Sequence, residues 1–353
     1  MSGKSRQVSM VIAGASIAVA IALCFTGGAR SAESVTPATQ VLQLPGGEAG
    51  IGFDDLQYAP LLKKILVPGG RSGRLFLIST SSRQISFIGG FTSKATYAGG
   101  HGDGTTSACE REGLIYATDR GSRSVKIVDP SAGKIIGSVR LSNSPDYVRC
   151  RPDVPEIWVT EPSKELIEIL ALSADGRSAK LSGSIMIQGG PESLILDPQR
   201  GRAYTHTWKG TTCVVNLKTR AVIGSWSNGC EGSRGGALDG EQGLLFVGCG
   251  EGKAVVIDVT TGKVVSSLKA GSDVDSVAFA AEMNHLYVPG AGSADLSILG
   301  VSGGGQLSLL DQMKTGPGAH TAAFDPEGHK VYIGLPEHGQ VLILEDTFPP
   351  SSR

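Results

Sequence analysis

The segment Leu114–Val139 reads LIYATDRGSRSVKIVDPSAGKIIGSV, and variants of it recur along the chain. Leu244–Leu268 reads LLFVGCGEGKAVVIDVTTGKVVSSL, and Ala203–Trp226 reads AYTHTWKGTTCVVNLKTRAVIGSW. Four looser copies begin at Ile65, Ile157, Leu286 and Val331. The copies recur roughly every 41–50 residues and each holds several short β-branched runs, which is typical of a β-propeller.

Turn residues divide each copy into strands. In the first copy quoted, LIYAT, VKIVD and IIGSV are separated by turns, and the turn Asp129–Gly133 has a counterpart at Asp258–Gly262. Asp supplies a side-chain acceptor and Gly the backbone freedom that such turns require. We therefore predict an all-β fold, a seven-bladed β-propeller with four antiparallel strands per blade. The predicted blades span residues 51–95, 104–144, 145–190, 191–230, 231–272, 273–317 and 318–346.

The last copy lacks a fourth strand, because the chain ends soon after QVLILED. Near the other end, TQVLQLPGG (Thr39–Gly47) matches SGSIMIQGG, the end of the third blade. An N-terminal strand paired into the last blade would close the ring and remove a free edge. We predict that Val41–Leu44 is the outer strand of blade seven; the alternative is a linker.

The repeat also carries a family resemblance. IYATDRGSRSVKIVDPSAGKIIGSV (Ile115–Val139) and IWVTEPSKELIEIL (Ile157–Leu170) resemble the YVTN-type repeat of YncE-like seven-bladed propellers, which are exported bacterial proteins. The resemblance spans nearly the whole chain after the N-terminal segment. It implies the fold, but not a function, because related rings include binding proteins, sugar-lactone hydrolases and copper-dependent nitrous oxide reductases.

The N-terminus has the pattern of an export signal. Lys4 and Arg6 precede an apolar run, Met10–Phe25, that is followed by small residues. A run of about 16 apolar residues is shorter than the ~20 that a spanning helix needs. We therefore predict a signal peptide over residues 1–32 and a single propeller domain over 33–353, periplasmic or secreted, with no membrane span. The alternative is an uncleaved anchor.

Composition excludes several functions. The formal net charge of −1 argues against nucleic-acid binding, which needs a basic surface. The sequence contains no H-E-x-x-H and no C-x-x-C-H, which removes the zinc-protease and c-type haem interpretations. Fifty glycines among 353 residues suit a fold made of short strands and tight turns.

One aligned position carries the candidate chemistry. In a propeller, the loop entering each innermost strand lines one mouth of the central channel. Six of the seven copies place an ionisable residue there, and the second copy has Asp103 and His101 beside it. We predict that these residues converge on a ligand-binding site: Asp54, His101, Asp103, Asp146, Glu192, Arg234, Asp275 and His320.

Three functions compete for this ring. The first, which we favour, is a non-catalytic scaffold. It would act as a monomer and bind a small ligand, an ion or a periplasmic protein partner at the channel mouth. The second is a metal-dependent hydrolase of the lactonase kind; oxygen-rich sites favour calcium, magnesium or manganese. Its candidate metal ligands are Asp54, Asp146, Glu192, Asp275 and His320. A copper or redox role is disfavoured because only His101 and His320 lie near the ring. A solvated channel mouth that binds nothing is the structural alternative.

The remaining histidines and the cysteines have structural interpretations. We expect His206 in an exposed loop beside Trp208 and Lys209, and His285, His329 and His338 on the surface. Export makes disulfides plausible. Cys230 and Cys249 flank a hairpin almost symmetrically, which predicts a bridge. Cys109 and Cys150 align in the innermost strands of adjacent blades, which leaves a second bridge between them as an alternative. We expect Cys213 to be a buried free thiol.

Overall fold

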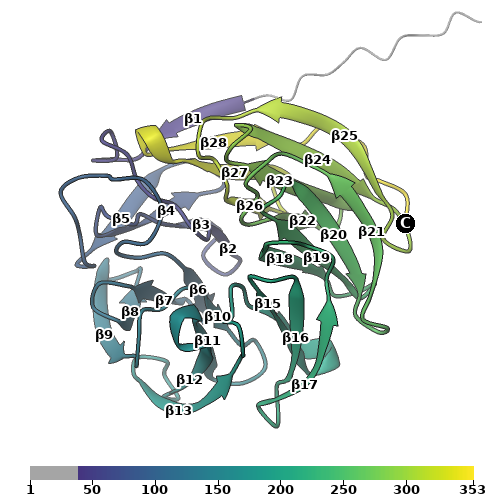
Figure 1. Ribbon diagram of the computed structural model, residues 1–353. Coiled ribbons are helices and arrows are strands. Elements are labelled where there is room, and N and C mark those ends of the chain that lie inside the picture. Colours follow the sequence, from purple (N-terminus) through teal and green to yellow (C-terminus); the bar gives the residue numbers. More distant parts are fainter. Residues whose placement is uncertain (1–38) are drawn as a thin grey trace, which may run out of the picture. The chain divides into compact units, whose positions relative to one another are not determined.

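The computed structural model describes residues 39–353, so the predicted signal segment 1–32 lies outside the described residues. The described chain forms seven four-stranded antiparallel sheets, one for each predicted blade, arranged as a ring (Figure 1). The prediction of an all-β seven-bladed propeller is confirmed.

The strands occupy four positions in each blade. The innermost strands are β2 (Gln57–Ala59), β6 (Ala108–Arg111), β10 (Val148–Cys150), β14 (Ile195–Asp197), β18 (Ser233–Asp239), β22 (Ala278–Ala280) and β26 (Ala322–Asp325). The second strands are β3 (Lys64–Pro68), β7 (Leu114–Asp119), β11 (Glu156–Glu161), β15 (Arg202–Thr207), β19 (Leu244–Cys249), β23 (His285–Gly290) and β27 (Lys330–Leu335).

The third strands are β4 (Arg74–Ser79), β8 (Ser124–Asp129), β12 (Leu166–Leu172), β16 (Thr211–Asn216), β20 (Lys253–Asp258), β24 (Asp295–Val301) and β28 (Gln340–Glu345). The outermost strands are β5 (Ile85–Gly89), β9 (Lys134–Arg140), β13 (Ala179–Met186), β17 (Ala221–Ser227), β21 (Lys263–Lys269), β25 (Leu307–Lys314) and β1 (Thr39–Gln43). Three short 3₁₀ helices interrupt the turns: η1 (Pro162–Lys164), η2 (Pro198–Arg200) and η3 (Pro336–His338).

The N-terminal strand closes the ring. β1 pairs antiparallel with β28, with Val41 opposite Leu342, and takes the outer position of blade seven (Figure 1). Leu44, directly after β1, is fully buried in the core between blades seven and one. The predicted closure by an N-terminal strand is therefore confirmed.

The core lies between blades rather than at the ring's centre. Within residues 39–353 there are seven clusters of buried apolar side chains, and each joins residues of two neighbouring blades. The second and third strands are covered on both faces, so all six residues of β7 are buried, whereas every residue of the outermost strand β21 is exposed or half-buried. Each blade is thus stabilised by burial against its neighbours.

The predicted turns form as their sequences require. Asp129 Oδ1 accepts hydrogen bonds from the backbone N–H of Ser131 (3.1 Å) and Ala132 (3.0 Å), and Gly133 follows with φ +64°. An L-residue with a side chain rarely adopts that φ, which explains the glycine. These turns lie at the end of each blade opposite the candidate site, because they join the third strand to the outermost one.

Candidate functional site

Two kinds of loop meet at one end of the ring. In an antiparallel blade, the chain enters the innermost strand and leaves the second strand at the same end. The predicted site residues belong to the first kind of loop. Five of them lie within three residues before an innermost strand: Asp54, Asp146, Glu192, Asp275 and His320. Arg234 is the second residue of β18, and His101 and Asp103 lie in the loop before β6.

A cavity of about 430 Å³ opens at this end of the ring, and we call it the mouth cavity. Five of the eight predicted residues line it: His101, Asp146, Glu192, Arg234 and Asp275. Its other lining residues are Arg120, Ser144, Pro162, Ser163 and Trp208. A side cavity of about 290 Å³ shares His101, Arg234 and Asp275 with it and adds His320.

The second kind of loop, which follows the second strand of each blade, also contributes residues to the two cavities. The sequence analysis did not recognise these residues as a group. Each of them directly follows the second strand of its blade and lines one of the two cavities: Arg120, Pro162, Trp208, Gly250, Ala291 and Pro336. Of these, the sequence analysis singled out only Trp208, as a neighbour of His206 in an expected exposed loop. The signal was present in the repeat, because these residues also occupy equivalent positions in the aligned copies.

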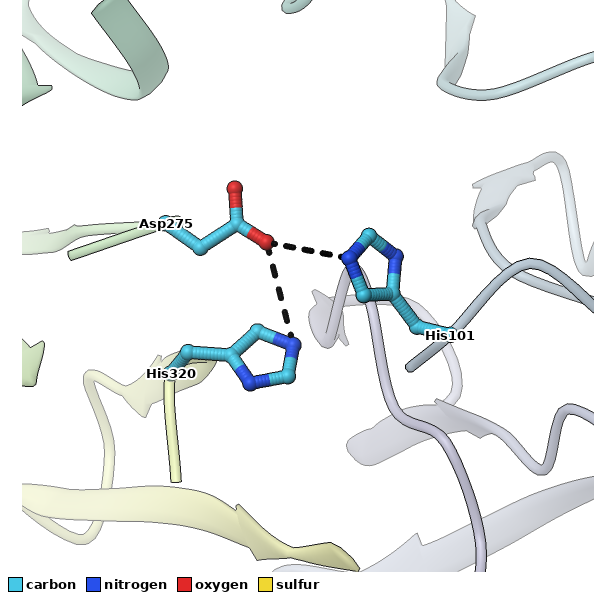
Figure 2. Close-up of side chains that lie close together, drawn as sticks. All are labelled: His101, Asp275 and His320. Atoms are coloured by element: carbon cyan, nitrogen blue, oxygen red, sulfur yellow. Dashed lines mark ion pairs between the residues drawn. The ribbon is translucent and has the colours of Figure 1, made fainter. Parts of the chain in front are cut away.

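His101 and His320 face the same oxygen. The Nε2 atom of His101 lies 3.6 Å from Asp275 Oδ2, and Nε2 of His320 lies 3.7 Å from that atom (Figure 2). The other nitrogen of each ring also has a partner: Nδ1 of His101 lies 3.1 Å from Asp54 Oδ2, and Nδ1 of His320 lies 2.5 Å from the Gly318 carbonyl oxygen. The structure therefore joins four blades through one cluster.

The charges of this cluster shift its pKa values. The carboxylate of Asp54, more than any other group, raises the pKa of His101 to about 10, against the effect of burial. Burial by itself would raise the pKa of Asp54, but His101 and Arg120 together outweigh burial and lower it. At neutral pH this pair is therefore an imidazolium and a carboxylate.

Asp146 lies between a guanidinium and a second acid. Arg120 Nη1 is 2.9 Å from Asp146 Oδ1 and 3.7 Å from Asp54 Oδ2. Burial, followed by the charge of Asp54, raises the pKa of Asp146 to about 8 even though Arg120 acts in the opposite direction.

Glu192 and Arg234 form the part of the mouth cavity with unused hydrogen-bonding capacity. Arg234 Nη1 is 3.8 Å from Glu192 Oε1, which is too long for a hydrogen bond. Both Arg234 Nη1 and Glu192 Oε2 are buried without a hydrogen-bond partner among the described residues. Burial, with the charges of Asp146 and Asp275, raises the pKa of Glu192 to about 9. At neutral pH Glu192 therefore carries a proton.

Trp208 marks the rim of the mouth cavity. The Arg234 guanidinium lies over its ring, 4.4 Å from the centroid, and 48% of the Trp208 surface is exposed. This stacking orients Arg234 toward Glu192 and leaves one aromatic side chain at the opening.

Not every predicted residue lies in a cavity. Asp103 pairs with Lys94 Nζ at 2.5 Å and is not among the described residues that line either cavity. Asp54 is buried behind His101. Of the five candidate metal ligands, the structure brings Asp275 and His320 together with His101. Asp54 pairs with the other nitrogen of His101, Asp146 pairs with Arg120, and Glu192 Oε1 lies 3.8 Å from Arg234 Nη1.

Two histidines were placed wrongly by the sequence analysis. His206 is fully buried rather than in an exposed loop; its Nδ1 lies 2.9 Å from Thr212 Oγ1, and burial lowers its pKa to about 3. His285 is also fully buried rather than on the surface, with Nδ1 2.7 Å from Asp346 Oδ2. His329 and His338 are exposed, as expected.

The cysteines agree with the predictions. Cys230 and Cys249 form a disulfide across the first hairpin of blade five, and Cys109 and Cys150 form the second, between blades two and three. Cys213 is a buried free thiol. Two disulfides fit an oxidising compartment.

Among residues 39–353, no helix has the length and apolar character needed to cross a membrane.

Comparisons with known proteins assign the fold and no family. No family model matches the sequence, and neither does any curated protein. The chain is similar to a solved chain of the Mitotic Checkpoint Complex, with a TM-score of 0.73, 14% identity, and coverage of 97% of this chain and 99% of that one. It is similar to a chain of hydrazine synthase from Kuenenia stuttgartiensis (TM-score 0.69, 12% identity, coverage 87% and 97%). It is also similar to the structure of U3-55K (TM-score 0.71, 14% identity, coverage 87% and 98%). These likenesses agree with a seven-bladed propeller and show the fold alone, because a fold does not determine a function.

Proposed function

We propose that this protein is a binding protein that holds a small polar ligand, bearing a carboxylate or a similar oxyanion, in the mouth cavity. The observation that carries the proposal is the pair Arg234 Nη1 and Glu192 Oε2, both buried without a hydrogen-bond partner among the described residues. A buried polar group without a partner costs about 1–3 kcal/mol. A ligand that bonds both groups recovers that cost.

The charges favour an anionic ligand. His101, Arg120 and Arg234 are cationic at this mouth, while the raised pKa values of Glu192 and Asp146 keep these two acids protonated at neutral pH. A protonated Glu192 donates a hydrogen bond instead of repelling an anion. Arg234 supplies the charge-assisted partner on the same side of the cavity.

The size and the remaining lining suit a small molecule. A volume of about 430 Å³ falls in the range of pockets for small ligands. Ser144 and Ser163 present hydroxyl groups that would pair with hydroxyls or amides of the ligand, and Trp208 would cover its apolar part. A hydroxylated or amidated carboxylic acid combines these features.

We favour binding over the metal-dependent hydrolase considered from the sequence. That alternative needs several carboxylates free to hold one ion, and the pairings of Asp54 with His101 and of Asp146 with Arg120 oppose it. We also propose that residues 1–32 direct export, that the mature protein acts as a monomer in the periplasm or outside the cell, and that the chain belongs with YVTN-type propellers.

The proposal is tested by a thermal-shift screen of chelator-treated protein. The probes are small hydroxy and amino carboxylic acids, each paired with its own amide. We expect one or more acids to raise the melting temperature and the matched amides to have no effect. Glu192→Leu and Arg234→Gln should abolish the response, whereas Glu192→Gln, which keeps a hydrogen-bond donor, should retain it. The control Asp311→Asn, on outer strand β25, should respond as the wild type does. An equal response in the Arg234→Gln variant, or no response to any acid, would refute the proposal.

A further inference from the structure

We infer that His101, Asp275 and His320 form a binding site for a divalent first-row transition-metal ion, between the mouth cavity and the side cavity. The three ligand atoms lie within 4.8 Å of one another. They come from loops of three different blades, and Figure 2 shows both imidazole rings turned toward the one Asp275 oxygen.

The spacing fits a coordination shell. With bonds of about 2.0–2.2 Å, neighbouring ligand atoms of a tetrahedral zinc ion lie roughly 3.3–3.6 Å apart. The distances from Asp275 Oδ2 to the two Nε2 atoms are 3.6 and 3.7 Å. Small side-chain movements would therefore bring all three atoms onto one ion.

The groups behind the two rings strengthen this assignment. A metal-binding histidine usually directs its second nitrogen at a carboxylate or a backbone carbonyl, which fixes the ring and leaves the other nitrogen to the metal. Asp54 takes this place at Nδ1 of His101 (3.1 Å), and the Gly318 carbonyl takes it at Nδ1 of His320 (2.5 Å). The two rings thus meet the same requirement through different partners.

A cation is also what the remaining acceptors call for. Both nitrogens of His320 donate to carbonyl oxygens, Nδ1 to that of Gly318 (2.5 Å) and Nε2 to that of Phe53 (2.9 Å). An ion would therefore replace the hydrogen bond to Phe53, with Asp275 Oδ2 3.7 Å from Nε2. An ion bound to Nε2 of His101 displaces the proton there, and the carboxylates of Asp54 and Asp275 then balance the two charges of the dication. Two imidazoles and one carboxylate favour zinc, cobalt, nickel or iron over calcium and magnesium, which departs from the ions expected from the sequence.

Three side chains of the described residues offer ligand atoms at this position, and two cavities border it. His101 and Asp275 line both cavities. A fourth coordination position would therefore face the mouth cavity, where an oxyanion of a bound ligand would reach it. Ion binding does not rest on the proposed ligand function, because the ion needs only the three side chains.

The test uses the metal alone on the full chain, tag-free and chelator-treated, with disulfides intact. Zn²⁺ is titrated by calorimetry, and Co²⁺ is followed by its visible absorption. We expect one equivalent of each to bind, and Ca²⁺ to bind at least 100-fold more weakly. His101→Gln, His320→Gln and Asp275→Asn should each weaken Zn²⁺ binding at least tenfold. Asp54→Asn, which removes only the group behind His101, should weaken it about 10–100-fold. The exposed control His338→Gln should bind as the wild type does.

Histidine modification by diethylpyrocarbonate, mapped by mass spectrometry, decides the question even where a variant fails to fold. Zn²⁺ should protect His320 and leave the exposed His329 and His338 reactive. Failure of Zn²⁺ and Co²⁺ to bind the wild type, or binding that survives in both histidine variants, would overturn the metal site. A positive acid screen on metal-free protein would then still support the ligand proposal, so the two failures are distinguishable.

Discussion

Replacing Glu192 by glutamine should stabilise the empty protein in a pH-dependent way. The unfolded chain releases the Glu192 proton near its ordinary pKa of 4.5, while the folded protein holds the proton up to a pKa of about 9. The folded state thus binds more protons than the unfolded state between these values, so wild-type stability falls as pH rises through that window. Glutamine has no proton to release in either state, and the variant escapes this loss.

The magnitude follows from the pH interval. Between pH 4 and pH 7 the wild type should lose about 3 kcal/mol from this one group, at about 1.4 kcal/mol per pH unit above 4.5. We therefore expect the stability of Glu192→Gln relative to wild type to rise by about 3 kcal/mol over that interval. Comparing two pH values cancels any constant effect of the substitution on packing.

Urea denaturation of both proteins at pH 4, 5.5 and 7, followed by tryptophan fluorescence with disulfides intact, measures this difference. Glu251→Gln is the contrasting control, because hydrogen bonds from the Glu231 and Gly232 N–H groups outweigh burial and lower the pKa of Glu251. Its effect should have the opposite sign. A change below about 1 kcal/mol for Glu192→Gln would mean that Glu192 is ionised in the folded protein, and the reasoning about the mouth cavity would be wrong.

Three further predictions concern the frame that holds the site. Burial lowers the pKa of His206 to about 3, against 6.5 ordinarily. Lowering the pH from 7.5 to 5 should therefore reduce the free energy of unfolding of the wild type by about 2 kcal/mol, and His206→Asn should not show this loss. Urea denaturation at both pH values measures the difference. Leu42→Pro in β1 should lower stability by about 3 kcal/mol, because the Leu42 N–H faces β28, as does that of Leu44, which donates to the Gly339 carbonyl. Val41→Pro, whose N–H faces away from β28, should cost less, and the urea midpoints of the two variants measure the difference. Replacing both Cys230 and Cys249 by serine should cost about 3 kcal/mol for a loop of 19 residues, and an unchanged urea midpoint would contradict a stabilising bridge.

The repeat predicted most of the fold, because each blade has the same pattern of strands and turns. The closing strand was predictable for a physical reason: the last copy lacked one strand, and the only unassigned β-like segment near the other end matched it. The hairpin disulfide was predictable from the symmetric placement of Cys230 and Cys249. The loops entering the innermost strands were found by alignment, whereas Arg120 was missed because the loops after the second strands were not aligned in the same way.

Burial of single side chains could not be predicted from the repeat. His206 is buried because residue 236 in the next blade is glycine; a Cβ there would lie 2.7 Å from His206 Nε2. His285 is buried against Asp346, which lies 61 residues later in the C-terminal segment. Both contacts depend on how distant segments meet, which strand periodicity does not encode. The meeting of His101, Asp275 and His320 at one oxygen depends on side-chain directions in the same way.

The most direct test of a functional channel mouth is to identify the metal ions and small molecules that remain bound to protein purified without chelator. Metals would be measured by plasma mass spectrometry, and small molecules released on denaturation by liquid chromatography and mass spectrometry. We expect the wild type to carry a carboxylic acid or a transition-metal ion in near-stoichiometric amount, Arg234→Gln to lose the acid, and His320→Gln to lose the ion. Wild type and both variants with the same content would contradict the account.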